Sequence, residues 1–567
     1  MADDAPRPDD IAALRAAAAE AAAQAAEARA AAAQAALDAA LAGAEDAPPA
    51  ASDDPYAAEV RAAYAAPGGT LPLGALLVAA DGAPAAPDPG TQVGFALSML
   101  NRHGLVAGAT GTGKTKTLQG MAEGLSAAGV PVFLADVKGD LSGLAVAGPD
   151  DARVAERAAS VGQEWAPTAF PVEAYSLGGL GHGVPVRTTV TDFGPLLLAK
   201  VLGLNDTQES SLGLVFHWAD TQGLALLDLK DLQATVAFLT SDEGRAELKG
   251  VGGVSAATAG VILREITALQ AQGADVFFGE PAFDTADLLR TTADGRGVVS
   301  CLELPDVQDR PALFSTFLMW LLADLYHDLP EVGDADRPRL VFFFDEAHLL
   351  FAGASKAFLE QVVQTVRLIR SKGVGVFFVT QSPKDVPADV LAQLGNRVQH
   401  ALRAFTPDDA KALRAAVRTF PRSPYDLEQL LQSLGTGEAV VTVLTEKGAP
   451  TPVAWTRVRA PQSSMSPAPA DALDALVAGS PLQARYGTAV DNESAFEVLA
   501  ARIAAEHAPA AQAEVDRATT TQRTPTSGRS DGAARTASSS VDRLLGSMAS
   551  TLGREITRSL FGTRRRR

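Results

Sequence analysis

The chain is poor in cysteine, the residue that disulfide-bonded secreted proteins require. Its 567 residues include one cysteine, Cys301, so an intramolecular disulfide is excluded and the side chain is expected to pack as a small apolar group in the core. The chain begins Met-Ala-Asp-Asp, which is acidic where a secretory signal is basic. An oxidising compartment is therefore not required, and we expect a cytoplasmic location.

Long hydrophobic runs are also missing. The longest, from Ala312 to Ala323, is interrupted by Asp324 after about a dozen uncharged residues, whereas a membrane-spanning helix needs roughly 20. This run therefore predicts a buried helix. Aromatic residues make up only 6% of the chain, but 47% of all residues are hydrophobic, a balance that is ordinary for a globular protein and excludes a fibrous one.

Positive charge is scarce, because 48 lysines and arginines are outnumbered by 67 aspartates and glutamates, which gives a net charge of −19. Binding to nucleic acid is driven by basic side chains that release counterions from phosphates. The charge balance excludes a protein whose whole surface sheathes nucleic acid, and it leaves a local basic channel open.

From about residue 67 to 460, short apolar runs alternate with longer helical patterns, as in strands joined by crossover helices. This alternation predicts an α/β core with a mostly parallel sheet. The segment from about 190 to 290 has several helical patterns and fewer strand signals, which predicts a helical insertion. The expected strands are Leu105–Ala107, Val132–Ala135, Val298–Leu302, Leu340–Phe344, Val374–Thr380, Val398–Leu402 and a hairpin of Ala439–Leu444 with Val453–Val458.

Three further segments flank this core. Residues 1–66 are rich in alanine and predict a helical segment. It is either a solvated helix or frayed tail, or a thin coiled coil or docking helix. Residues 461–540 predict a mixed helical segment and a flexible linker. Residues 541–567 predict an amphipathic helix with a basic end, which could dock onto a neighbouring subunit, lie on an anionic membrane or contact DNA.

The strongest single pattern is Gly108-Ala-Thr-Gly-Thr-Gly-Lys-Thr115, a full match to the phosphate-binding loop between a strand-like run and a helical run. Its glycines let successive backbone N–H groups turn toward phosphates, and the helix N-terminus adds partial positive charge. Lys114 is expected to reach the β- and γ-phosphates of ATP, and the Thr115 hydroxyl to bind Mg²⁺. The residues predicted to contact the nucleotide are Gly108, Ala109, Thr110, Gly111, Thr112, Gly113, Lys114, Thr115 and Lys116.

A second pattern, Leu340-Val-Phe-Phe-Phe-Asp-Glu346, is an uncharged run that ends in two carboxylates, at the edge where parallel sheets bind ligands. Asp345 is expected to hold Mg²⁺ through water, and Glu346 to orient and deprotonate the attacking water. Two carboxylates that merely cap a strand are the alternative, which the phosphate-binding loop upstream disfavours. His348 is expected to be a structural residue near the site.

Three residues beyond these motifs are candidates for phosphate chemistry. Gln381 follows an expected strand, and if that strand lies between the loop strand and the carboxylate strand, its amide is placed to sense the γ-phosphate. Arg370 and Arg397 are candidates for stabilising charge on the transferred phosphoryl group, within the subunit or across an interface, with ordinary surface arginines as the alternative.

Charged residues also follow the expected strand Val132–Ala135, in the run Asp136-Val-Lys-Gly-Asp-Leu141. Asp136 and Lys138 either line the site or couple it to neighbouring subunits. A simple turn built on Gly139 is the competing interpretation.

Together these motifs resemble the bacterial HerA-like ATPases related to the YjgR protein, within the HerA/FtsK superfamily. The resemblance covers residues 67–460 and extends to the C-terminal run Leu552-Gly-Arg-Glu-Ile556. The motifs that carry it are Asn101–Thr115, Ala135–Leu141, Phe344–His348 and Thr380–Pro383.

The resemblance implies a RecA-like ATPase core, a hexameric homo-oligomer and kinship with proteins that pump DNA through a central pore. Archaeal HerA proteins have an N-terminal β-barrel, which residues 1–66 do not suggest, so a nuclease partner that docks on it is left open. The residues whose roles the resemblance also implies are Lys114, Thr115, Asp345, Glu346, Gln381 and Arg370, the last as an arginine placed before the sensor strand.

Two functions remain open at this point. An ATP-driven DNA translocase or helicase-like motor is favoured by the resemblance. A motor or switch that acts on a protein or membrane-associated assembly is favoured by the basic C-terminal helix. A scaffold that binds ATP without turnover is disfavoured, because Glu346 stands where hydrolysis needs a carboxylate.

Overall fold

The computed structural model describes residues 52–79, 84–248, 250, 252–307, 310–333, 335–351 and 356–505. The chain divides into two compact units, Met1–Ala500 and Ala501–Arg567. Residues 501–505 of the second unit are described and are helical; everything else below belongs to the first unit. The alanine-rich tract before residue 52, the expected linker after residue 505 and the expected amphipathic helix 541–567 lie outside the described residues.

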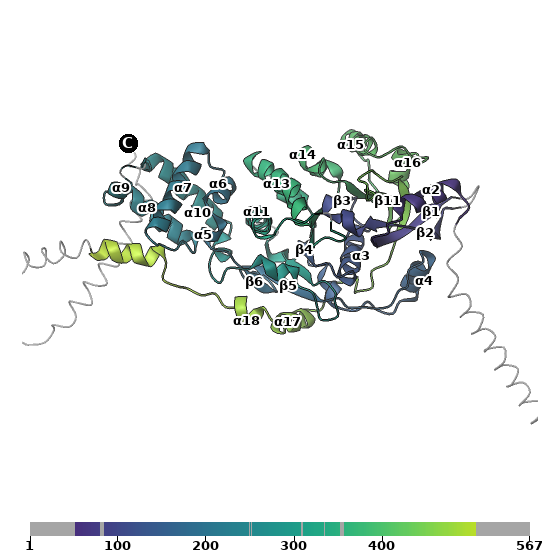
Figure 1. The fold of residues 1–567 in the computed structure, drawn as a ribbon, viewed down its shortest axis with the longest axis horizontal. Coiled ribbons are helices and arrows are strands. Elements are labelled where there is room, and N and C mark those ends of the chain that lie inside the picture. Colours follow the sequence, from purple (N-terminus) through teal and green to yellow (C-terminus); the bar gives the residue numbers. More distant parts are fainter. Residues whose placement is uncertain are drawn as a thin grey trace, which may run out of the picture. The chain divides into compact units, whose positions relative to one another are not determined.

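One sheet of twelve strands runs through the described part of the first unit (Figure 1). The strands β10-β3-β9-β8-β4-β7-β5-β6 are parallel, and β11, β12, β1 and β2 continue the sheet beyond β10 in antiparallel pairs. The bounds are β1 (Thr70–Val78), β2 (Ala86–Ala96), β3 (Gly104–Ala107), β4 (Val132–Asp136), β5 (Val172–Leu177), β6 (Val184–Val186), β7 (Val299–Glu303), β8 (Leu340–Phe344), β9 (Val374–Thr380), β10 (Asn396–Gln399), β11 (Glu438–Thr442) and β12 (Ala454–Val458).

The order of the central strands decides which loops meet. β9 pairs with β3 on one side and with β8 on the other, and β8 also pairs with β4. Because parallel strands all end at one edge, the segments that follow β3, β9, β8 and β4 leave the sheet side by side. The strand before Gln381 therefore lies between the loop strand and the carboxylate strand, which is the arrangement on which the sensor prediction depended.

Helices cover both faces of the central strands, and alternate strand residues face each of them. Phe343 and Phe377 lie in a core cluster with Leu118 of α3. On the other face, Phe133 stacks on Phe317 of α11, with ring centroids 6.3 Å apart. Among the described residues, the α-helices outside the insertion include α2 (Pro55–Tyr64), α3 (Lys114–Ala127), α4 (Ala152–Ser160), α11 (Pro311–Asp328), α12 (His348–Phe351), α13 (Lys356–Ile369), α14 (Ala388–Leu391), α15 (Pro407–Val417), α16 (Leu427–Ser433), α17 (Ala470–Ala478) and α18 (Gln483–Tyr486).

Within the described residues, six α-helices follow one another between β6 and β7, in the segment where the sequence predicts a helical insertion, and Figure 1 shows them gathered in one group. Asn205 and Asp228 begin two of them as capping boxes, which satisfy free N–H groups of the first turn. Trp218 and Phe238 pack between them at 5.5 Å. The bounds are α5 (Val190–Phe193), α6 (Pro195–Val201), α7 (Asp206–Thr221), α8 (Leu229–Thr240), α9 (Gly244–Glu247) and α10 (Ala256–Ala271).

The apolar run that raised the question of a membrane span forms part of α11. Leu318, Leu321 and Leu325 of this helix are buried, as expected for a core helix. Among the described helices, none combines the length and the hydropathy that crossing a bilayer requires.

The predicted α/β class with a mostly parallel sheet is confirmed, and all eight expected strands are present. β10 ends at Gln399, so the expected run Val398–Leu402 overlaps only its last two residues. Four strands were not expected. β2 contains prolines, which sequence patterns exclude from strands but an edge strand tolerates. Each strand of the β5–β6 pair carries a polar residue or a proline in its apolar run.

Candidate functional site

The phosphate-binding loop joins β3 to α3 and is anchored to neighbouring segments by backbone hydrogen bonds. The Gly108 N–H donates to the carbonyl of the last residue of β9 at 3.2 Å, and the Ala109 N–H donates to the Ala401 carbonyl at 2.8 Å. On the other side, the Gly437 N–H donates to the Thr112 carbonyl at 2.9 Å. The loop is thus held by the last residue of β9, by the segment that follows β10 and by the residue before β11.

Two glycines of the loop adopt backbone conformations that other residues rarely reach. Gly111 has φ 78° and Gly113 has φ 110°, both in the left-handed region. A Cβ atom on Gly113 would also lie 3.1 Å from the Gly437 nitrogen. The glycine spacing in the sequence is therefore required by the backbone of the loop itself.

Lys114 begins α3, and its side chain turns back over the loop. The residue is only 8% exposed, and its ammonium group donates to the Ala109 carbonyl at 3.2 Å. Burial lowers the pKa of Lys114, and the carboxylates of Glu346 and Asp345 oppose this shift. The loop lysine and both predicted carboxylates therefore lie within electrostatic reach of one another.

The side chain of Lys116, by contrast, is directed to a different partner. Its ammonium group donates to the Met465 carbonyl at 2.6 Å and to the Gln119 side-chain oxygen at 3.2 Å. The predicted contact of Lys116 with nucleotide therefore rests on its backbone N–H alone.

A buried histidine supports the loop from behind. His400 directly follows β10, and its N–H donates to the carbonyl of Ala107, the last residue of β3, at 2.7 Å. Its ring lies between the Thr117 hydroxyl, 2.9 Å from Nε2, and the Glu438 carbonyl, 2.9 Å from Nδ1. Burial lowers the pKa of His400 to about 4, so at neutral pH the ring is uncharged, donates from Nδ1 to the carbonyl and accepts from the hydroxyl.

Asp345 and Glu346 follow β8 directly, at the edge where the phosphate-binding loop lies. Both are buried, with 3% and 6% of their surfaces exposed. Burial raises the pKa of Asp345 to about 6, and the adjacent Glu346 carboxylate acts in the same direction. Glu346 has φ 46°, a left-handed conformation that is uncommon outside glycine.

The Glu346 carboxylate has a cationic neighbour. Its Oε1 atom forms an ion pair with the ammonium group of Lys138, and its Oε2 atom lies 3.2 Å from the His348 ring. Burial alone would raise the pKa of Glu346, but the Lys138 ammonium outweighs it and the pKa lies below its usual value. The two effects are reversed for Lys138. Burial alone would lower the pKa of Lys138, but the Glu346 carboxylate raises it above its usual value.

The residues at this edge fit a magnesium ion. Asp345 Oδ2 is buried and accepts no hydrogen bond within the described part of the chain, so a carboxylate oxygen is free for a ligand that carries positive charge. The Thr115 hydroxyl, at the start of α3, likewise forms no hydrogen bond with any described residue. Mg²⁺ prefers oxygen ligands and keeps several waters, and this donor set is suited to it.

Gln381 follows β9 beside the loop. The preceding residue, Thr380, accepts the hydrogen bond from Gly108 with its carbonyl, and its hydroxyl donates to Asp385 at 3.0 Å. The Ser382 N–H also donates to Asp385, at 2.9 Å. These bonds fix the backbone on both sides of Gln381, whose side chain is exposed.

The two candidate arginines lie elsewhere. Arg370 precedes β9, at the edge of the sheet opposite to the phosphate-binding loop, and the seven-residue strand between the two edges spans roughly 20 Å. Arg370 therefore cannot contact nucleotide bound to the loop of its own subunit. Arg397 lies within β10, opposite Leu105 of β3, and its guanidinium group donates to the Thr419 hydroxyl.

A model of the helicase HerA-like C-terminal family matches residues 83–567. The chain belongs to this family. With the phosphate-binding loop and the strand order β10-β3-β9-β8-β4, membership identifies a RecA-like P-loop NTPase core of the HerA/FtsK superfamily, as the sequence motifs predict.

Solved structures that are similar to the chain include those of two further proteins. The plasmid coupling protein TrwB, in complex with a non-hydrolysable ATP analogue, shares 16% identity at a TM-score of 0.48, over 70% of this chain and 95% of that chain. VirB4 of Thermoanaerobacter pseudethanolicus shares 13% identity at a TM-score of 0.42, over 69% and 96% of the two chains. No curated protein matches the chain.

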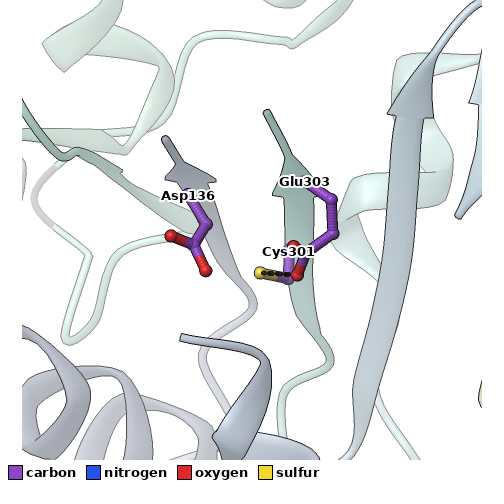
Figure 2. A group of neighbouring side chains, drawn as sticks. All are labelled: Asp136, Cys301 and Glu303. Carbon is purple, nitrogen blue, oxygen red and sulfur yellow. Dashed lines mark hydrogen bonds between the residues drawn. The ribbon is translucent and has the colours of Figure 1, made fainter. Parts of the chain in front are cut away.

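A second group of side chains in this HerA-like chain consists of two carboxylates, at the ends of β4 and β7, and a thiol within β7 (Figure 2). Asp136, Cys301 and Glu303 are all buried, and one carboxylate oxygen or sulfur atom of each lies within 4.8 Å of the others. The oxygens of Asp136 accept backbone N–H bonds from Lys138, Gly139 and Leu141 at 3.2, 2.8 and 2.7 Å. Asp136 thus fixes the turn that follows β4, and this turn places Lys138 beside Glu346. A role of Asp136 and Lys138 in the site or in coupling it to neighbouring subunits stays a prediction.

Glu303 should make the stability of the protein depend on pH. Burial, then the Asp136 carboxylate, raises the pKa of Glu303 to about 8, so the folded chain keeps a proton that the unfolded chain loses above about pH 4.5. The contribution of protonated Glu303 to the stability of the fold is therefore complete below about pH 4.5 and is lost as pH rises from 4.5 through 8. Relative to Glu303→Gln, the free energy of unfolding should fall by about 1 kcal/mol per pH unit in this window, as measured by urea denaturation at several pH values. If the difference in the free energy of unfolding between the wild type and Glu303→Gln does not change with pH, this prediction is wrong.

Two features of the site were not predicted from the sequence. His400 lies in a strand-like run of the sequence, and nothing in that run indicates that its ring contacts the Thr117 hydroxyl. The ion pair of Lys138 with Glu346 joins two segments that are 208 residues apart in the sequence. The adjacency of β4 and β8 would have indicated it, had the strand order been predicted in full.

Proposed function

We propose that this HerA-like chain is an ATP-hydrolysing motor that forms a ring and drives DNA translocation or a helicase-like process. The observation that carries the ATPase part is the convergence of Lys114, Asp345 and Glu346 at one edge of the sheet, where each carboxylate keeps a buried oxygen that accepts no hydrogen bond from a described residue. Such an arrangement is costly for stability and suits groups that engage a substrate.

Each residue of the site has a chemical role in this proposal. The loop N–H groups and Lys114 bind the phosphates of ATP, and Thr115 and Asp345 would hold Mg²⁺, which supplies charge neutralisation of the phosphates when bound. Glu346 orients the attacking water and removes its proton. Gln381 contacts the γ-phosphate and reports its loss to the segment after β9.

Arg370 supports the oligomeric part of the proposal. Burial and the guanidinium groups of Arg102 and Arg367 lower the pKa of Arg370, and none of the three forms an ion pair with a described residue. An unpaired basic group at the edge opposite to the loop is suited to the phosphates of a neighbouring subunit. We therefore place Arg370 in the site of the next subunit of a homo-oligomer, a hexamer by family resemblance, and leave Arg397 as a candidate of lesser support because it is bonded to Thr419.

DNA is the proposed cargo, and a protein assembly is the alternative. If DNA is moved, ATP hydrolysis by the full chain should be stimulated by double-stranded DNA, and the stimulation should weaken steeply as salt is raised, because phosphate contacts release counterions. Phosphate release with and without DNA at two salt concentrations checks this. ATPase activity that is indifferent to DNA, together with no salt-sensitive DNA binding, would favour the alternative.

A further inference from the structure

Lys138 and Glu346 are brought together by the pairing of β4 with β8. These strands are parallel with Ala135 opposite Phe344, so Lys138 and Glu346 leave the same edge of the sheet after three and two further residues. The backbone at Lys138 is itself fixed, because its N–H donates to Asp136 at 3.2 Å. The register of β4 and β8 and the buried Asp136 carboxylate thus fix the position of Lys138.

The two oxygens of Glu346 have different surroundings. Oε1 is engaged in the ion pair with the Lys138 ammonium group. Oε2 is buried and accepts no hydrogen bond from any residue that the structure describes, although the His348 ring is 3.2 Å away. One oxygen is therefore held, and the other is left for a further hydrogen-bond donor.

The backbone of Glu346 is held as well. A left-handed conformation is unfavourable for a residue with a Cβ atom, and it persists only where neighbouring contacts impose it. Here the Glu346 N–H donates to Asp345 Oδ1 at 2.9 Å, and the Ala347 N–H donates to the Val379 carbonyl at 2.9 Å. The side chain of Glu346 is fixed at its base by these bonds and at its tip by Lys138.

We propose that Lys138 is a positioning residue: by holding Oε1 of Glu346, it leaves Oε2 as the atom that accepts the proton of the attacking water. The inference rests on the proposed function, in which Glu346 is the base. Lys138 contributes no proton and forms no bond with substrate in this scheme. The competing role is a direct contact of its ammonium group with the γ-phosphate, which would act on nucleotide binding.

The two roles differ in which kinetic constant they affect. Lys138→Met should lower kcat about 10- to 100-fold, the usual cost when a reacting group loses its orienting partner, while the KM for ATP changes little. Lys138→Arg, which can still form the ion pair, should restore most of kcat. Unchanged kcat in Lys138→Met, or a raised KM with normal kcat, would overturn the proposal. Lys411→Met, on the exposed face of α15, is the matched control and should behave as wild type.

A double variant separates this inference from the proposed function. If Lys138 acts through Glu346, then Lys138→Met should add no further loss to Glu346→Gln in single-turnover assays. Additive losses would show that Lys138 acts independently and would overturn the inference, while the role of Glu346 would stand. If Glu346→Gln alone hydrolyses ATP at the wild-type rate, the role of Glu346 as the base in the proposed function fails first, and the base is another group. Near-native circular dichroism of each variant shows that the losses do not reflect unfolding.

Discussion

Replacement of Glu346 by glutamine should stop ATP hydrolysis and leave ATP binding intact. A glutamine keeps the size of the side chain but cannot accept a proton, so the loss in kcat should be at least about 100-fold, in the range that general-base catalysis contributes. The measurement is phosphate release by the full chain, together with binding of a fluorescent ATP analogue.

Glu303→Gln is the matched control for this experiment. Glu303 is also a buried glutamate at the carboxyl edge of the sheet, but burial raises its pKa to about 8, so at neutral pH a glutamine replaces a side chain that is already uncharged. Its ATPase activity should be close to that of wild type. Hydrolysis by Glu346→Gln at the wild-type rate would assign the base to another group.

Arg370→Ala should lose about 1,000-fold in kcat, the lower end of what a transition-state arginine supplied across an interface contributes. The reason is geometric, since the residue lies at the far edge of the sheet from its own loop. The distinctive result comes from mixing. When Arg370→Ala and Glu346→Gln subunits are co-expressed, about a quarter of head-to-tail interfaces combine an intact Glu346 with an intact Arg370, and activity should return.

The mixed assembly distinguishes the two sides of an interface. If Arg370 acted within its own subunit, no subunit of the mixture would hold both residues and activity would stay absent. Arg153→Ala, an exposed arginine of α4, serves as the control and should hydrolyse ATP normally by itself. A normally active Arg370→Ala protein would remove Arg370 from the site altogether.

The central strands and the nucleotide loop could be predicted because their signals are local. A run of apolar residues that ends in Asp345 and Glu346 is buried on both faces whatever surrounds it, and the glycines of the loop are fixed by their own backbone angles. The residues at the carboxyl edge could therefore be named from the sequence, although their chemical roles stay predictions.

Contacts between distant segments were not predictable in the same way. The opposite positions of Arg370 and Gln381 follow from their places at the two ends of β9, yet the sequence leaves open whether Arg370 acts within the subunit or across an interface. The ion pair of Lys138 with Glu346 depends on the pairing of β4 with β8. Lys116 and Gln119 of α3 donate hydrogen bonds to the carbonyls of Met465 and Ser464. The sequence around these two acceptors has no apolar pattern that would have predicted the contact.

The central claim is that the edge formed by the phosphate-binding loop, Asp345 and Glu346 hydrolyses ATP. Its most direct test is the release of labelled phosphate from γ-labelled ATP by the purified full chain at neutral pH with magnesium. We expect continuous release that stops when a chelator removes the magnesium. ATP that binds but remains intact, both with and without DNA, would contradict the claim.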